Sequence, residues 1–143
     1  MLEADLFTSY WHKPALKHPP YDAVLKIGIS RRKSRFVTYA CEELDDVPFA
    51  PSEALLRWWK GCAQTPEDEA VYERTYRAAL EAAGIEQVAA ALREKVADHD
   101  AAILLCHEKT GRFCHRHIFA QWWQERTGQK ITEIYGPVLP VPT

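Results

Sequence analysis

Residues 101–123 read AAILLCHEKTGRFCHRHIFAQWW, and this stretch holds the strongest structural and chemical signals in the chain. The apolar run at residues 101–105 predicts a buried strand, and residues 118–123 predict a helix. The loop between them carries the densest group of reactive side chains: two Cys, three His, two Arg and a Glu. A strand, a short polar loop and a helix N-terminus form the usual ligand site of an α/β protein. The functional site is therefore predicted in this loop.

The bulk composition is that of an ordinary globular protein, with 47% hydrophobic and 27% charged residues. A chain of 143 residues suits one domain with a sizeable core, so we expect a single α/β domain over 1–143 with a Pro-rich tail at 137–143. The net charge of −2 gives no global attraction for nucleic acid or a membrane. No apolar run approaches the length of about 20 residues that spans a bilayer. Without a secretory signal, we expect a cytoplasmic protein with reduced thiols and leave its oligomeric state open.

Hydrophobic spacing and turn residues predict strands and helices in the order β, β, a short β, three helices, β, α, β. The predicted strands are residues 5–10, 23–30, 36–40, 101–105 and 130–135, and the predicted helices are residues 53–60, 66–83, 85–97 and 114–127. Prolines in residues 11–20 predict a loop without regular structure. The buried stripe predicted for the helix at 66–83 consists of Val71, Tyr72, Thr75, Ala79 and Ala82.

This order predicts an α/β fold, a mostly parallel sheet with helices packed on it in a Rossmann-like three-layer arrangement. Right-handed crossovers would bring the carboxyl ends of the strands at 5–10, 23–30 and 101–105 to one edge. That edge would carry Tyr10, Ser30 and the basic run at 31–35, which has four cations in five residues. The basic run indicates either a solvated loop or a phosphate site at a strand end. Its candidate ligand-binding residues are Arg31 and Arg32.

The first interpretation of the central loop is a metal-free site for an anionic ligand. Arg112, His115 and Arg116 would bind an anion or a base at the helix N-terminus, and Glu108 would act as a general acid or base. The ligand would be a nucleotide, a nucleic acid or another phosphate-bearing small molecule. Cys106 and Cys114 would be either reactive or small packed residues. Whether the chain is an enzyme is left open.

Two alternative interpretations use the cysteines. A zinc site would take Cys106, Cys114 and His117 as ligands, with His107 or His115 as the fourth. The protein would then be a structural or interaction module. A phosphatase-like site would use the Cys-x5-Arg spacing of Cys106 and Arg112, with the thiolate attacking a phosphate held by the arginine.

The same residues resemble the signature of the domain-of-unknown-function 488 family. That signature is a Leu-Leu-Cys-x-Glu strand end, matched at residues 104–108, followed by a Cys-His-Arg helix start, matched at 114–116. Weaker similarities lie at residues 8–10, 27–30, 72–76, 120–122 and 127–128. The resemblance implies a small α/β fold and a polar site, without supplying a reaction. The site residues that it implies are Cys106, Glu108, Cys114, His115 and Arg116.

Overall fold

The computed structural model describes residues 2–34 and 36–135, and at its centre is a sheet of five parallel strands. The strands are β1 Asp5–Tyr10, β2 Leu25–Gly28, β3 Glu42–Glu43, β4 Ala101–Cys106 and β5 Ile131–Glu133. Their order across the sheet is β3-β2-β4-β1-β5, and every neighbouring pair is parallel. The predicted α/β fold with a parallel sheet is confirmed. The Pro-rich tail predicted at 137–143 lies outside the described residues.

Strand β4 is central because both of its faces are apolar. Ala102 and Leu104 belong to one hydrophobic cluster, Ile103 and Leu105 belong to the other, and none of the four is exposed. Parallel strands buried on both faces have such continuous apolar sequences. Strand β4 pairs with β1 on one side, ending at Tyr10↔Cys106, and with β2 on the other.

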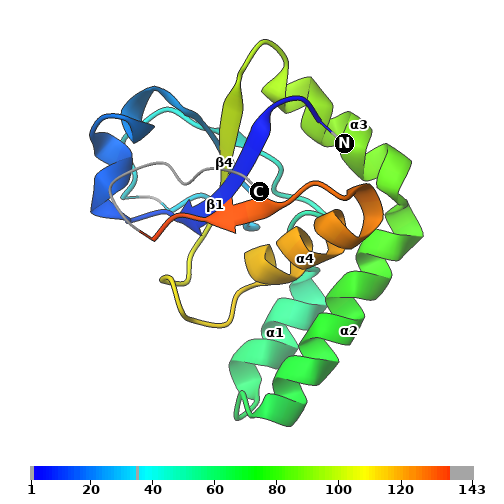
Figure 1. The fold of residues 1–143 in the computed structure, drawn as a ribbon. Coiled ribbons are helices and arrows are strands. Elements are labelled where there is room, and N and C mark those ends of the chain that lie inside the picture. Colours follow the sequence, from blue (N-terminus) through cyan, green and yellow to red (C-terminus); the bar gives the residue numbers. More distant parts are fainter. Residues whose placement is uncertain (1, 35, 136–143) are drawn as a thin grey trace.

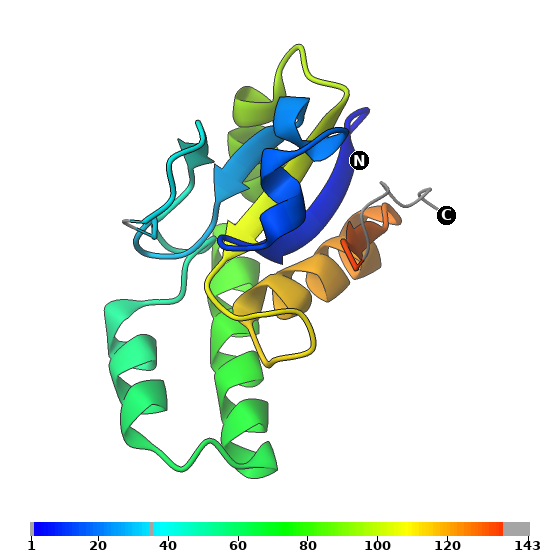
Figure 2. The ribbon, with the colours of Figure 1, turned by 90° about the vertical axis from the view of Figure 1, so that its left-hand side faces the viewer.

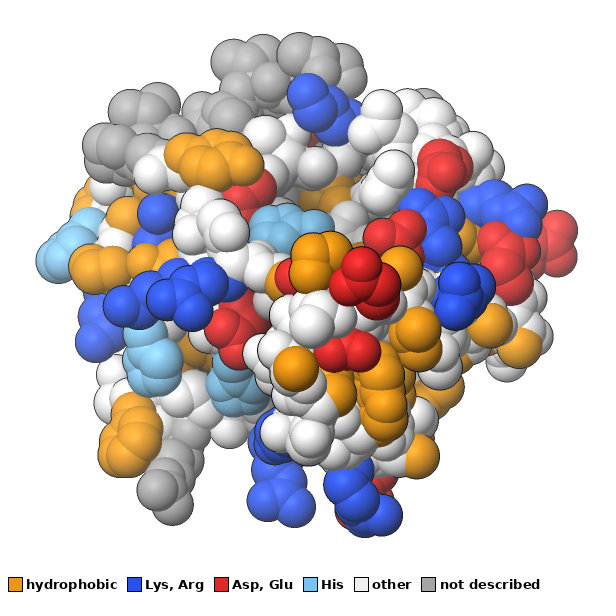
Figure 3. Space-filling model, turned by 90° about the horizontal axis from the view of Figure 1, so that it is seen from below, with side chains coloured by type: hydrophobic (Ala, Val, Ile, Leu, Met, Phe, Trp, Pro, Cys, Tyr) orange, Lys and Arg blue, Asp and Glu red, His pale blue; other side chains and the backbone are white. Residues whose placement is uncertain are grey.

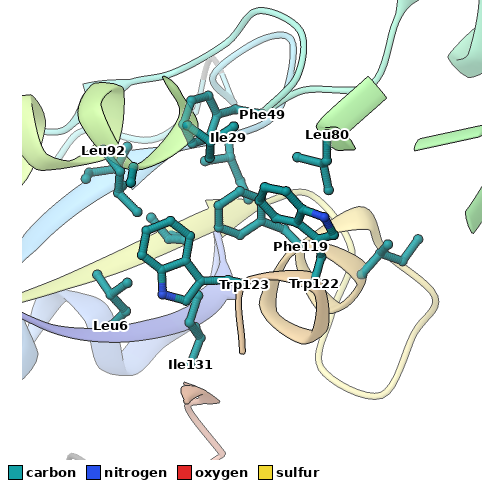
Figure 4. Packing of buried hydrophobic residues seen from close by; sticks show 14 of the residues in the cluster. Leu6, Ile29, Phe49, Leu80, Leu92, Phe119, Trp122, Trp123 and Ile131 are labelled. Carbon is teal, nitrogen blue, oxygen red and sulfur yellow. The ribbon is translucent and has the colours of Figure 1, made fainter. Parts of the chain in front are cut away.

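Four α-helices pack on one face of the sheet. They are α1 Glu53–Gly61, α2 Pro66–Ala83, α3 Ile85–Val96 and α4 His115–Thr127. Figure 1 shows α4 lying against the sheet, with α1 and α2 extending together beyond its edge. Figure 4 shows Phe119 and Trp123 of α4 among apolar side chains that come from β1, α2 and α3. None of the helices in the described residues is both long and apolar enough to cross a membrane.

The other face of the sheet is covered by a thinner layer. It contains the short 3₁₀ helices η1 Pro14–Lys17 and η2 Tyr21–Ala23, which lie in front of the strands in Figure 2. Leu16 and Tyr21 of these helices are buried against the β4 residues Ile103 and Leu105. The prediction of no regular structure at residues 11–20 was wrong, because a proline fits the first turn of a helix, where its missing N–H is not needed.

Two further predictions from the sequence were wrong. No strand forms at residues 36–40. Instead Val37 and Tyr39 join the second hydrophobic cluster, and the Tyr39 hydroxyl donates to the Trp11 carbonyl at 2.6 Å. The stripe predicted for α2 was right at Tyr72 and wrong at its other positions: the buried residues are Tyr72, Tyr76 and Leu80, because these larger side chains reach the core from one helical face.

Capping residues and glycines mark the boundaries of the helices. Thr65 and Asp68 form a reciprocal capping box at the start of α2. Gly84 separates α2 from α3 with a φ of +86°, and Gly128 ends α4 in the left-handed conformation. These caps fix the lengths of the helices that surround the site.

Gly28, the last residue of β2, gives the first testable prediction. A Cβ atom there would lie 2.5 Å from Cζ2 and Cη2 of Trp11, whose buried ring is held by a hydrogen bond from Nε1 to the Ser30 hydroxyl at 3.1 Å. Gly28→Ala should therefore lower the free energy of unfolding by about 1–3 kcal/mol in urea denaturation. Trp11→Phe removes the clashing ring atoms, so Gly28→Ala should cost less in that background. Equal costs in the two backgrounds would contradict the explanation.

Candidate functional site

The carboxyl ends of β1, β2 and β4 meet at one edge of the sheet, as predicted. The Trp11 N–H donates to the Cys106 carbonyl at 3.0 Å, and the Ile29 N–H donates to the Leu105 carbonyl at 2.9 Å. The segments that follow the three strands therefore start side by side. The loop after β4 then leads into α4, whose N-cap residue is Cys114.

A cleft of about 920 Å³ opens at this edge. It is bounded by the loop after β2, by α1, by the first turns of α2 and by the loop from His107 to His115. Figure 3 shows the molecule from below, a face on which Lys and Arg side chains lie among Asp and Glu, His and hydrophobic side chains. The cleft has the size of a small-molecule site.

Cations outnumber carboxylates in the cleft lining. The lining cations are Arg31, Arg32, Arg57, Lys60 and Arg112, and the lining carboxylates are Glu53, Glu69 and Glu108. Arg57 pairs with Glu53 at 3.2 Å. Within residues 2–34 and 36–135, no ion pair or side-chain hydrogen bond occupies the other four cations. The cleft therefore presents unpaired positive charge although the whole chain is slightly negative.

Three aromatic rings form one wall of the cleft. Phe113 lies 4.9 Å from Trp59 and 5.1 Å from Tyr72, centroid to centroid, and the rings of Trp59 and Tyr72 are 5.3 Å apart. Each ring comes from a different element: Trp59 from α1, Tyr72 from α2 and Phe113 from the loop after β4. Sequence analysis placed Tyr72 in the buried stripe of its helix and did not identify this wall.

Cys106 and Cys114 are joined by a disulfide in the structure. The expectation of reduced thiols does not hold for this pair, whereas Cys41 and Cys62 are free. The two sulfurs meet because the loop between them folds back through a turn, with Gly111 at a φ of +89°. Cys106 is fully buried and does not line the cleft, whereas Cys114 lines it. In this state no thiolate faces the cleft beside Arg112, as the phosphatase-like alternative would need.

His115 is buried and neutral beside Cys114. Burial, together with the nearby Arg116 and the imidazoles of His107 and His117, lowers its pKa to about 4, against the hydrogen bond to Ile29. Nε2 lies 2.7 Å from the Ile29 carbonyl, which can only accept, so Nε2 carries the proton. Nδ1 is therefore an acceptor, and it lies 3.9 Å from Cys114 Sγ.

Arg116 lies behind the cleft and contacts only protein groups. Its Nε and Nη2 donate to the two carboxylate oxygens of Glu133 at 3.0 and 2.9 Å. Nη1 lies 3.1 Å from Cys106 Sγ and donates to the Glu108 carbonyl at 2.6 Å. Because Arg116 is fully buried and all these donors are used, it positions the loop instead of contacting a ligand.

Glu133 completes this network, and sequence analysis missed it. Its carboxylate also accepts hydrogen bonds from the hydroxyls of Thr8 at 2.7 Å and Thr110 at 2.8 Å. The hydrogen bonds from Arg116, Thr8 and Thr110 lower its pKa, against the opposing effect of burial. The sequence could have identified it from the spacing on β5, because Glu133 is two residues after Ile131 and alternate residues of a strand share a face, here the buried one.

Most of the predicted site residues line the cleft. Glu108, Cys114 and His115 do so among the predicted catalytic residues, and Ser30, Arg31, Arg32 and Arg112 do so among the predicted ligand-binding residues. Tyr10 does not line it, although it pairs with Cys106 across the sheet.

The predicted zinc site corresponds only in part to what the fold brings together. The potential ligand atoms of Cys106, Cys114 and His115 lie within 4.8 Å of one another. His117 and His107 do not belong to this group, and His107 Nε2 lies 2.9 Å from the Arg32 carbonyl. Zinc binds thiolates, whereas the two sulfurs here are bonded to each other. In this state the group is not a set of metal ligands.

A family model described as the active DUF488-N3 subclade, DUF488-N3a, matches residues 10–127. The chain belongs to this family. The match covers the cleft residues and both cysteines of the disulfide, and it confirms the resemblance found in the sequence. Among curated proteins and solved structures there is no match. Membership in DUF488-N3a therefore assigns no ligand or reaction to this chain.

The buried imidazole predicts a pH-dependent stability for this DUF488-N3a domain. The pKa of His115 is about 4 in the folded protein and 6.5 in the unfolded chain, so the unfolded chain binds more protons between these values. The stability that neutral His115 contributes is complete above pH 6.5 and is lost as the pH falls toward 4. From pH 7 to pH 5, the wild type should lose about 2 kcal/mol relative to His115→Gln. Urea denaturation of both proteins at the two pH values measures this, and parallel losses would contradict it.

The buried ion pair predicts an asymmetric response to substitution. Arg116→Met leaves the Glu133 carboxylate buried without its cation, so the free energy of unfolding should fall by about 3–5 kcal/mol. Adding Glu133→Gln should recover much of this loss, because a neutral amide costs less to bury. The exposed pair of Arg57 and Glu53 is the control, and Arg57→Met should change the free energy by less than about 1 kcal/mol. If Arg116→Met costs no more than Arg57→Met, the positioning role is wrong.

Proposed function

We propose that this DUF488-N3a domain binds a nucleotide, either free or within a nucleic-acid strand, in the cleft beside the loop after β4. One observation carries the proposal: four cations without an ion pair in the described part of the chain line the same cleft as a three-ring aromatic wall. A nucleotide joins a negatively charged phosphate to a flat base, and these two parts match the two kinds of lining.

The cations are arranged to favour a phosphate group. Arg31 and Arg32 follow β2, Arg112 lies in the loop after β4, and Lys60 is near the end of α1. Three separate elements thus direct positive charge toward one space. Arginine binds phosphate through paired N–H groups, which gives geometric specificity as well as charge. Glu69 and Glu108 offset only part of this charge.

The aromatic wall supplies a surface for a base. Trp59 is half-buried by its ring contacts with Tyr72 and Phe113. Stacking of a base on such a side chain is worth about 1–3 kcal/mol and depends little on which base is bound. The wall would therefore accept nucleotides with different bases. Glu108 and Cys114 line the same cleft, so a bound nucleotide would lie beside a carboxylate and a sulfur.

Affinity measurements on charge variants test the phosphate contacts. Arg32→Ala and Arg112→Ala should each weaken binding of a fluorescent mononucleotide or a labelled single-stranded oligonucleotide by about tenfold, because each removes a charge-assisted hydrogen bond. The control is Arg93→Ala, since Arg93 is exposed on α3 and does not line the cleft. Affinity should also fall with rising salt. Unchanged affinity in both cleft variants would refute the proposal.

A matched pair of tryptophan variants tests the stacking wall. Trp59→Leu should weaken mononucleotide binding and leave the weaker binding of inorganic pyrophosphate unchanged, because pyrophosphate has no base. Trp58→Leu is the control, since Trp58 is the neighbouring residue on α1, is 38% exposed and does not line the cleft. Equal losses for the two ligands in Trp59→Leu would show that the wall does not hold a base. Tighter binding of the oligonucleotide than of the mononucleotide would favour a nucleic-acid strand.

A further inference from the structure

We propose that Cys106 and Cys114 form a dithiol–disulfide pair that exchanges with the disulfides of small anionic thiols entering the cleft. Three observations support this inference: the two cysteines are paired, their sulfurs differ in access, and each sulfur has polar groups beside it. It rests on the proposed function only for the preference for anions, because the sulfur chemistry does not require a nucleotide.

The two sulfurs differ in access, as exchange requires. Cys114 lines the cleft and is 7% exposed, whereas Cys106 at the end of β4 is fully buried and does not line the cleft. In a two-cysteine exchange, one thiolate attacks the substrate and the second must reach the first without competing for the substrate. Cys114 is therefore the attacking residue and Cys106 the resolving residue.

The groups around Cys114 favour its attack. Cys114 is the N-cap of the 13-residue helix α4, and a helix N-terminus stabilises a nearby thiolate. The unprotonated Nδ1 of His115 lies 3.9 Å from its sulfur and is placed to accept a hydrogen bond from the thiol when the pair is reduced, which orients the sulfur.

The buried sulfur has its own stabilising group. Nη1 of Arg116 lies 3.1 Å from Cys106 Sγ, so a guanidinium faces this sulfur from behind the cleft. A cation at this distance favours the thiolate, which is the form that Cys106 needs in order to attack Cys114. Arg116 is thus a positioning residue that also favours the resolving step.

The exchange balances as two steps. Cys114 thiolate attacks one sulfur of the substrate disulfide, the substrate S–S bond breaks, and one thiolate leaves and takes a proton from water. A mixed disulfide remains on Cys114. Cys106 thiolate then attacks Cys114 Sγ and releases the second thiol, leaving the disulfide that the structure contains. Two electrons pass from the cysteine pair to the substrate, and a dithiol reductant returns the pair to the reduced state.

The charge of the cleft selects the substrate class. Arg31, Arg32 and Arg112 line the same cleft as Cys114 and are free of ion pairs within the described part of the chain. They would attract disulfides that carry carboxylates and repel those that carry ammonium groups. A small anionic thiol, joined to itself through a disulfide, is therefore the expected partner.

Trapping the mixed disulfide tests the mechanism. The reduced full-length chain is prepared with Cys41→Ser and Cys62→Ser, so that only the pair reacts. With glutathione disulfide, the intact pair should release two glutathione molecules and end as the intramolecular disulfide. Adding Cys106→Ser should instead trap one glutathione on Cys114, visible by intact mass spectrometry. Cys106→Ala serves as the second trapping variant if the serine variant does not fold.

Two comparisons decide the outcome. In the Cys106→Ser variant that retains Cys62, Cys114 should react faster than Cys62, which is half-buried and does not line the cleft. A rate at Cys114 no greater than at Cys62, or zinc retained by the pair in place of reaction, overturns the proposal.

Glutathione disulfide should react at least about tenfold faster than cystamine, and Arg112→Ala should reduce that ratio. Equal rates with glutathione disulfide and cystamine would overturn the proposed preference for anionic substrates. Nucleotide titration of the same variants stays a separate measurement, so failure of exchange is distinguishable from failure of nucleotide binding.

Discussion

The buried ion pair between Arg116 and Glu133 is the interaction on which the site depends. A guanidinium removed from water is costly unless its charge and its donors are satisfied, and here a bidentate carboxylate, a sulfur and a carbonyl satisfy them. These partners belong to β5, to the end of β4 and to the loop after it. One side chain on the first turn of α4 therefore holds the helix, the loop and an edge strand together. The loop is tied to this pair through the Glu108 carbonyl, which accepts from Arg116, and the Thr110 hydroxyl, which donates to Glu133.

This arrangement divides the polar residues into two layers. Arg116, Glu133, Thr8 and Thr110 form the inner layer, where each polar group has a protein partner. The outer layer consists of groups that line the cleft, and its cations other than Arg57 have no partner among the described residues. The Cys106–Cys114 bond connects the layers, since one sulfur lies in each. A charged residue of a sequence motif, such as Arg116, can thus hold a site in place from behind without lining the cleft.

The sequence predicted the elements and their convergence well because those depend on local patterns. The apolar run of β4, the capping box at Thr65 and the glycine stops are properties of a few adjacent residues. Contacts between distant segments were not predictable in the same way. The partner of Arg116 is 17 residues away, and the aromatic wall joins three elements that share no pattern. The short strand expected at residues 36–40 failed because Tyr39 found a partner on Trp11, which only the folded chain brings near.

The positive charge of the cleft is a local property that the composition conceals. The chain as a whole has a net charge of −2, so its long-range field does not attract anions. Several acids pair with cations elsewhere on the surface, as Glu81 does with Arg126 and Glu73 with Arg77. The cations beside the disulfide lack such partners in the described residues. An anion that enters the cleft would therefore meet a field made by nearby side chains, and it would meet that field next to the sulfur of Cys114. Charge and sulfur would act on the same ligand because the parallel sheet brings the ends of β2 and β4 to one edge.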